Sequence, residues 1–289
     1  MTAKAISAKD VAELRARTGA GMMDCKAALQ EADGDMEKAG EILRKKGTAK
    51  AEKRSDRSAS QGLVVIETSA DGRDAAMIEL NCETDFVAKN ADFIALAKDL
   101  AKHALAHAPQ GAHPGAAIEA QPFRSSTVGE AVKEVSGKTG EAMALKRVAR
   151  LTQPKGGVST YLHFNNMLGV LIDLEGPAGE ALTGLGRELG FHIASMDPMG
   201  VGESDIPAET IARERRIAEE QVAQEGKPEA IRGKIVDGKV RKFIAERTLL
   251  GQPFVKDDKQ TVAELVKAAG NAAGGEIAVR RFARFKVGE

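Results

Sequence analysis

The sequence TVGEAVKEVSGKTGEAMALKRVARL, residues 127–151, has a close counterpart later in the chain in TVAELVKAAGNAAGGEIAVRRFARF, residues 261–285. The two segments align without a gap at a spacing of 134 residues, and ten of their 25 positions are identical. Ordinary residue frequencies would give about two identities by chance. Each segment predicts a short helix, a glycine-containing turn and a strand. The chain therefore contains an internal duplication.

A β-hairpin is predicted before each copy of this repeat. In the first, the runs GLVVIETS and DAAMIELN flank Asp71 and Gly72, and in the second, VSTYLHF and LGVLIDL flank Asn165 and Asn166. A helical pattern follows each hairpin. Runs of strands with helices grouped between them are typical of antiparallel sheets in α+β proteins. The sequence predicts an α+β core of two related subdomains with antiparallel sheets, not a parallel Rossmann arrangement.

Helical regions are predicted outside this duplicated core. Three short helices open the chain, the third is expected to stop at Gly47, and a polar linker is expected after it. A later region is dense in charge, has apolar residues at helical spacing and is broken at Gly226, Lys227 and Pro228, which predicts an antiparallel helical hairpin. Its apolar stripe is narrow, so a projecting arm is favoured over a helix pair lying flat on the sheet.

These elements divide the chain into four predicted parts. They are a three-helix domain with its linker in residues 1–55, one core subdomain in 56–152, the other in 153–202 and 250–289, and the inserted hairpin in 203–249.

The composition limits the class of protein. The 289 residues include 42 Lys+Arg and 42 Asp+Glu, so the formal net charge is zero, whereas a chain whose main role is to bind nucleic acid usually has a basic excess. Aromatic residues make up only 3%, which disfavours base-stacking platforms. Cys25 and Cys82 lie in different predicted elements and no signal peptide or membrane span is expected, so the cytoplasm is the expected location.

The run ELNCETDFVAK, residues 79–89, lies where the second predicted strand ends and a helix is about to begin. Thr84 and Asp85 are both suitable helix caps. Phe86 either fills this corner as a core residue or projects from it, and burial statistics alone leave both open. Alignment of the two hairpins places Glu180 opposite Phe86. Because a core residue would be expected to have an apolar counterpart, this difference favours projection.

Signals for catalysis are weak. Residues 136–139 resemble the end of a phosphate-binding loop, but Val132 stands where that motif requires glycine, and a helix precedes the turn in place of a strand. His103 and His107 have the spacing of a zinc-binding pair, but Ala104 replaces the required glutamate and no third ligand is indicated. We expect no catalytic residue, no cofactor and no metal site, and therefore no enzyme.

Two runs together resemble the signatures of the elongation factor Ts family: LRARTGAGMMDCKAAL, residues 14–29, and ELNCETDFVAK. The resemblance covers almost the whole chain. The first helices resemble the family's ubiquitin-associated-type domain, the duplication its two-part core, and the helical hairpin its coiled-coil arm. YLHF and GQPFV, residues 161–164 and 251–255, are also similar to family segments. Some members have a further C-terminal helical module, which is not expected here after Lys286.

This resemblance implies a function in protein biosynthesis. Members of the family are guanine nucleotide exchange factors of the translational GTPase elongation factor Tu (EF-Tu), which they bind in its GDP-bound and nucleotide-free forms. The resemblance implies that a tip displaces Mg²⁺ and disturbs the phosphate site of the partner. The residues of that tip would be Thr84, Asp85, Phe86 and Val87.

Further partner contacts are implied at Met22 and Met23 in the first domain and at His163 in the second subdomain. Exposed methionines suit an adaptable interface, although burial statistics leave a core role equally open for them. Direct binding of a nucleotide, a nucleic acid or a membrane is not expected.

Two other functional classes remain open from the residues. One is an adaptor that binds ribosomes or chaperones and does not change nucleotide release. The other is a nucleotide-hydrolysing enzyme that uses the turn at Gly137.

Overall fold

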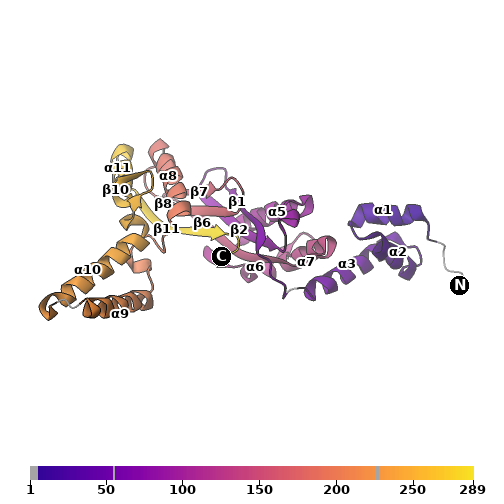
Figure 1. The fold of residues 1–289 in the computed structure, drawn as a ribbon. Helices are drawn as coiled ribbons and strands as arrows, with labels where there is room; N and C mark the ends of the chain where they lie inside the picture. Colours follow the sequence, from indigo (N-terminus) through magenta and orange to yellow (C-terminus); the bar gives the residue numbers. More distant parts are fainter. Residues whose placement is uncertain (1–5, 55, 226–227) are drawn as a thin grey trace.

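The computed structural model describes residues 6–54, 56–225 and 228–289, and the fold is mixed α and β as predicted (Figure 1). Gly226 and Lys227 of the predicted arm, the start of the N-terminal segment and Ser55 lie outside the described residues. The chain opens with three helices packed around a small apolar core, α1 (Ala8–Thr18), α2 (Met22–Glu31) and α3 (Met36–Glu52).

The predicted end of the third helix at Gly47 is wrong, because α3 continues to Glu52 and takes up the first part of the predicted linker. The added turns are stabilised by a neighbour. Gly47 lies against Gly137 of α7 (Val128–Thr139) so closely that a Cβ on Gly137 would stand 2.9 Å from the Gly47 Cα. Ala51 is buried and Glu52 pairs with Lys133 of α7. Tertiary packing therefore outweighs the helix-ending tendency of a glycine.

The duplicated core consists of two antiparallel sheets. The first has the strand order β1-β2-β6-β3 and the second β11-β8-β7. The bounds are β1 (Gln61–Thr68), β2 (Asp74–Cys82), β3 (Gly111–Pro114), β6 (Met143–Thr152), β7 (Gly156–Leu162), β8 (Leu168–Glu175) and β11 (Ala278–Lys286). Four short strands form two further pairs: β4 (Pro122–Phe123), β5 (Ser126–Thr127), β9 (Pro253–Phe254) and β10 (Asp257–Thr261).

Helices cover the outer face of each sheet. Phe93, Leu96 and Leu100 of α5 (Ala91–His107) share one core with α7 and the alternate residues Ala76, Ile78, Leu80 and Cys82 of β2. In the second copy, α8 (Glu180–Met196) and α11 (Val262–Ala273) cover β8 in the same way. One-turn helices lie at the edges: α4 (Asp85–Ala88), α6 (Ala116–Glu119), and the 3₁₀ turns η1 (Glu203–Asp205) and η2 (Leu249–Gly251).

The strand registers confirm the duplication residue by residue. Ala76 pairs with Arg150 in the first sheet, and the equivalent Val170 pairs with Arg284 in the second. Both pairings contain a β-bulge at the same place, opposite the step from Glu79 to Leu80 in one copy and from Asp173 to Leu174 in the other. A bulge inserts one unpaired residue and bends the strand, so the two sheets share the same local curvature.

A buried carboxylate stands beside each bulge and is paired with arginine. Glu79 accepts from Arg147 Nε at 2.6 Å, and the equivalent Asp173 accepts from Arg281 Nε at 3.1 Å. Both carboxylate residues are buried. Asp173 has a second donor in Gln153, whereas Glu79 Oε1 has no hydrogen-bond partner among the described residues. The pair in the first sheet therefore depends on its arginine more than the second pair does.

The inner faces of the two sheets share a third apolar core, which joins the subdomains into one body. Val64 and Met77 of the first sheet pack with Leu171 and Phe285 of the second. A Cβ on Gly169 would stand 2.6 Å from Val64 Cγ1, so this close approach requires glycine. Arg147 also spans the interface, because its guanidinium donates to the Lys286 carbonyl and lies over the Phe285 ring.

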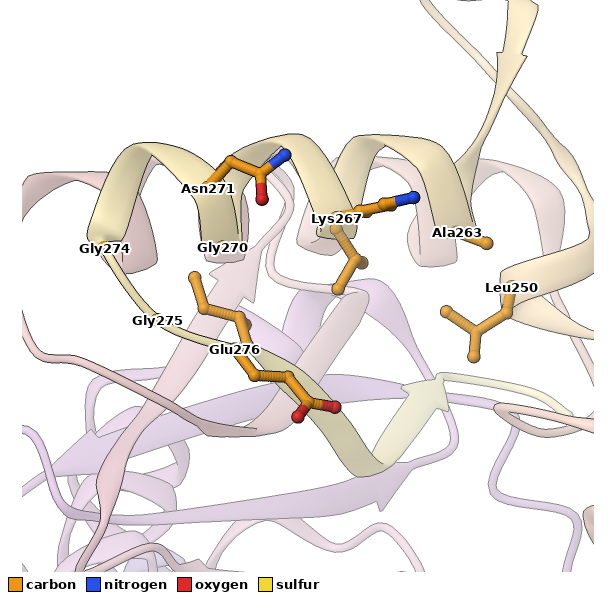
Figure 2. A pocket seen from close by; sticks show the side chains of 10 residues that line it. Leu250, Ala263, Lys267, Gly270, Asn271, Gly274, Gly275 and Glu276 are labelled. Carbon is orange, nitrogen blue, oxygen red and sulfur yellow. The ribbon is translucent and has the colours of Figure 1, made fainter.

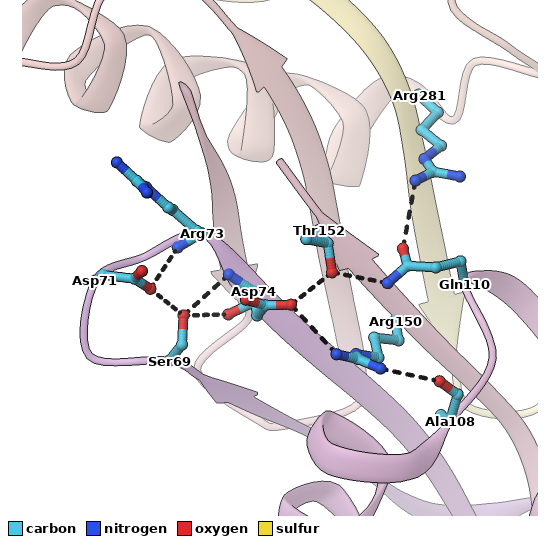
Figure 3. Close-up of polar contacts among 9 residues, drawn as sticks. All are labelled: Ser69, Asp71, Arg73, Asp74, Ala108, Gln110, Arg150, Thr152 and Arg281. Carbon is cyan, nitrogen blue, oxygen red and sulfur yellow. Dashed lines mark hydrogen bonds and ion pairs between the residues drawn. The ribbon is translucent and has the colours of Figure 1, made fainter. Parts of the chain in front are cut away.

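Polar contacts join the same sheets at their ends (Figure 3). Thr152 and Arg150 of β6 donate to Asp74 of β2. Gln110 donates to Thr152 and accepts from Arg281 of β11. A chain of hydrogen bonds therefore runs from the first sheet to the last strand of the second.

The inserted region forms the predicted antiparallel helix pair, α9 (Ala208–Gln224) and α10 (Glu229–Arg247). The pair extends away from the sheets and does not lie flat on them (Figure 1). Among the described residues of the arm, four are buried in the seam between the helices, namely Ala218, Val222, Val236 and Val240. No helix in the described part of the chain is both long enough and apolar enough to cross a membrane.

We predict that Arg147→Ala lowers the free energy of unfolding by about 3 kcal/mol, because it leaves the Glu79 carboxylate buried and unpaired. Arg281→Ala is the matched control and should cost only about 1 kcal/mol, since Gln153 still donates to Asp173. Urea unfolding followed by circular dichroism measures both values. Equal losses would contradict the assignment of unequal roles to the two arginines.

Candidate functional site

The corner after β2 is built from two consecutive helix caps. Thr84 caps α4, where its side chain accepts from the Val87 N–H, and Asn90 caps α5 by accepting from Asp92 and Phe93. Thr and Asn favour such positions because their side-chain oxygens satisfy backbone N–H groups that a helix start leaves unpaired. The chain therefore makes a single helical turn between β2 and α5. We call Thr84, Asp85, Phe86 and Val87 the tip.

The tip presents Phe86 to solvent. Its side chain is 81% exposed, although Ala88 is buried and Val87 packs partly on the core of the first sheet. The interpretation of Phe86 as a core residue is therefore wrong, because the helical turn places its neighbours against the sheet and Phe86 on the outer side. A largely exposed phenylalanine in a chain with few aromatic residues marks a surface suited to apolar contact.

Two carboxylates hold this corner to the turn between α7 and β6, and we call the arrangement the reciprocal clamp. Glu141 accepts from the Thr84 N–H at 3.0 Å and from the Thr84 hydroxyl at 2.6 Å. In the opposite direction, Glu83 accepts from the Ala142 N–H at 2.7 Å. Each glutamate thus satisfies a backbone donor next to the other glutamate. Hydrogen bonds to charged acceptors are stronger than neutral ones, so the clamp restrains the tip.

Glu141 is not among the residues predicted from the sequence, although the repeat shows a difference between the two copies at this position. The aligned position in the second copy is Gly275, so the clamp and the tip are both absent there. The glycines before these positions, Gly140 and Gly274, both end their helices with positive φ values of 80° and 71°. The turn itself is shared, and only the carboxylate that reaches the tip differs.

The remaining polar groups of the tip are paired within the corner. Asp85 accepts from Lys89 at 2.7 Å, and this hydrogen bond is the main reason why the pKa of Asp85 is lowered. The Cys82 thiol donates to the Thr84 carbonyl at 3.1 Å, and burial raises the pKa of this thiol to about 12. Cys82 is therefore protonated at neutral pH and unsuited to act as a nucleophile.

Met22 and Met23 lie in the first turn of α2 and are 51% and 75% exposed. The core of this domain instead uses Cys25, Ala28 and Leu29 from the same helix. The interpretation of the methionines as core residues is wrong, because the helical spacing turns them away from that face. The helix that carries them, α2, lies at the opposite end of the molecule from the arm formed by α9 and α10 (Figure 1).

His163 lies in the turn between β7 and β8. Its Nδ1 is 2.9 Å from the Tyr161 hydroxyl, and its ring contacts Phe164 with the ring centroids 4.5 Å apart. Phe164 is 88% exposed and was not among the predicted residues. Its position next to two asparagines in the hairpin turn indicates exposure, because turn residues usually face solvent. This turn is a second exposed aromatic site, on the other subdomain.

The residues with weak catalytic signals have structural roles. Ser136 and Thr139 lie in the last turn of α7, and the Ser136 hydroxyl donates to the Glu141 carbonyl. His103 is hydrogen-bonded to Gln121, and burial lowers its pKa. Within the described ranges, no group of three or more His, Cys, Asp or Glu residues is arranged to hold a metal ion.

Fold and site together define a class of protein: a duplicated α+β core in which only one copy carries a clamped aromatic tip. The family model described as elongation factor TS matches residues 83–289. The elongation factor Ts of Alkalilimnicola ehrlichii is 44% identical over 285 residues, which span 99% of this chain and 93% of that protein. The elongation factor Ts of Aquifex aeolicus is 43% identical over 290 residues, with 98% of each chain covered. The chain therefore belongs to the elongation factor Ts family.

The reciprocal clamp has a predictable pH dependence. The pKa of Glu83 is lowered from 4.5, first because the Ala142 N–H donates to it and further because Arg57 is close. The stabilisation is therefore complete above pH 4.5, the unfolded value, and is lost as the pH falls through the lower folded value. The amide proton shift of Ala142, followed by NMR, should titrate in this acid range.

The matched variant is Glu83→Gln, which keeps the acceptor oxygen but does not titrate. Its Ala142 amide shift should stay nearly flat over the same pH range. An unchanged titration in Glu83→Gln would show that another group controls this amide.

Proposed function

We propose that this chain binds EF-Tu loaded with GDP and promotes the release of GDP, as a guanine nucleotide exchange factor in protein biosynthesis. The observation that carries the proposal is Phe86, exposed on a tip that only one of the two related subdomains carries. The supporting observation is the clamp from Glu83 and Glu141, which fixes the direction in which Phe86 projects. Family membership supplies the expected partner.

The tip is suited to act as an apolar wedge. Insertion of Phe86 between helices of the partner would remove its ring from water, which is worth about 1.5–3 kcal/mol. A bound nucleoside diphosphate depends on Mg²⁺ and on a preformed set of backbone N–H donors. A small displacement of that site therefore weakens GDP binding strongly. The proposed action of Thr84, Asp85, Phe86 and Val87 is to displace Mg²⁺ and disturb the phosphate site.

No covalent step is part of this proposal, so the chain would be an exchange factor and not an enzyme. It would bind EF-Tu in both the GDP-bound and the nucleotide-free form, in the cytoplasm where translation takes place. It would bind no nucleotide directly, and it would need neither a cofactor nor a nucleic acid or membrane partner.

Two other surfaces are proposed to hold the partner while the tip acts. Met22 and Met23 offer flexible, exposed apolar side chains that adapt to a helix of the GTPase domain. His163, with its neighbour Phe164, offers an aromatic contact from the second subdomain. Contacts on both sides of the tip would fix its position, since a wedge without such supports would lose orientation.

We predict that Phe86→Ala lowers the second-order rate constant of stimulated GDP release by about tenfold to a hundredfold, the equivalent of the lost burial of one Phe ring. Asp85→Ala should have a smaller effect, because Asp85 is already paired with Lys89. Stopped-flow release of a fluorescent GDP from EF-Tu measures both. Unchanged stimulation by Phe86→Ala would refute the wedge, and a larger loss in Asp85→Ala would indicate direct competition with magnesium.

The same experiment separates the alternative functions. A plain adaptor would bind EF-Tu or another partner without accelerating GDP release. A nucleotide-hydrolysing enzyme would bind the fluorescent nucleotide in the absence of EF-Tu. Either result with the wild-type chain would contradict the proposed exchange activity.

A further inference from the structure

An open groove of about 600 Å³ runs along α11 on the second subdomain (Figure 2). Val266 and Gly270 of α11 form one wall, and the segment that leads into β11, ending at Ile277, forms the other. Leu250 closes one end. Lys267 and Glu276 stand on opposite walls, so the groove has an apolar floor and charged edges (Figure 2).

The internal duplication identifies the equivalent surface in the first subdomain, where a helix covers part of it and a cavity of about 380 Å³ remains. Val132 and Lys133 of α7 correspond to Val266 and Lys267 of α11. The C-terminal half of α3 packs on this surface, and Ala51 and Glu52 line what remains of the cavity beside Val132 and Lys133. In the first subdomain, therefore, a helix packs along the edge of this type of groove.

The contacts of α3 show which helix chemistry fits. At the crossing with α7 the helix presents Gly47, which allows backbone contact with Gly137. Near its end it presents Glu52, whose Oε1 is 2.9 Å from Lys133 Nζ, and this hydrogen bond is the main reason why the pKa of Lys133 is raised. Small residues and a terminal carboxylate are therefore the features that recognise the surface.

The groove on α11 keeps the charge that such a helix would pair with. No carboxylate in the described part of the chain forms an ion pair with Lys267, the counterpart of Lys133. One difference limits the binding geometry. Asn271 replaces Gly137, so a helix could not touch the backbone of α11 at that point and would instead pack over Ala263 and Lys267.

We propose that the groove on α11 binds an amphipathic helix of a partner protein, with small residues on its contact face and a carboxylate placed to pair with Lys267. The length of α11, 12 residues, matches about three turns of such a helix, or roughly 18 Å. The occupant is assigned to a partner because α3, the helix of this chain with that chemistry, is already packed on α7. This surface is separate from the tip and its proposed action on GDP.

The probe for this site is a peptide with the sequence of residues 36–54, MEKAGEILRKKGTAKAEKR, labelled with a fluorophore and held helical by a staple on its outward face. A staple is needed because short isolated helices are marginally stable in water. Fluorescence anisotropy with the full chain measures binding. The site predicts that Ala263→Arg, which fills the groove, weakens binding by about tenfold or more.

The matched control is Ala212→Arg, which adds the same side chain to an exposed alanine of α9 outside the groove and should leave binding unchanged. Charge reversal gives an independent test. Lys267→Glu should weaken binding by about two- to fivefold, and a peptide with Glu52→Lys should restore it. Thermal melting of each variant confirms that it is folded.

Binding that is equally strong to Ala263→Arg, or no binding to the wild-type chain, would overturn the proposal. So would a dimer of the chain, seen by sedimentation, that Ala263→Arg dissociates and Ala212→Arg does not. That last result would assign the groove to a second copy instead of a partner.

Discussion

The geometry of the tip depends on the two carboxylates of the reciprocal clamp. A strand that turns sharply into a helix leaves backbone N–H groups without sheet partners, and such groups are costly if they stay unpaired. Glu141 satisfies Thr84, and Glu83 satisfies Ala142, so two turns that are distant in sequence hold each other. The clamp lets Phe86 remain exposed on a fixed turn.

The duplication allows the two subdomains to be compared with each other. Bulge, buried carboxylate and arginine recur in both sheets, which marks them as scaffold. The differences mark specialised surfaces. The first copy adds α4, Phe86 and Glu141, whereas the second has Gly275 in place of Glu141 and a larger groove on α11, at the surface that α3 covers in part in the first. Comparing aligned residues of the two subdomains therefore separates the shared scaffold from the features of one copy.

Much of the fold could be predicted from the sequence because it rests on local period and on self-similarity. Alternation in β2 and β8, the helical spacing of α5 and α8, and the constant offset of the repeat are visible in one dimension. The extension of α3 to Glu52 was not predictable, since it depends on contact with Gly137. Glu141 and Phe164 have signals in the repeat and in the hairpin turn, but neither a long-range hydrogen bond nor an exposed turn produces a periodic pattern.

In the proposed mechanism, Phe86 makes the chain and GDP oppose each other on EF-Tu. Thermodynamic linkage would then require bound GDP to lower the affinity of the chain for EF-Tu by the same factor by which the chain lowers the affinity of GDP. The direct measurement is the pair of dissociation constants for nucleotide-free and GDP-loaded EF-Tu, with wild type and with Phe86→Ala. We predict a ratio above about 150-fold for wild type, the upper end of ordinary couplings, and a much smaller ratio for the variant. A wild-type ratio near one, or an equal ratio for the variant, would contradict the account.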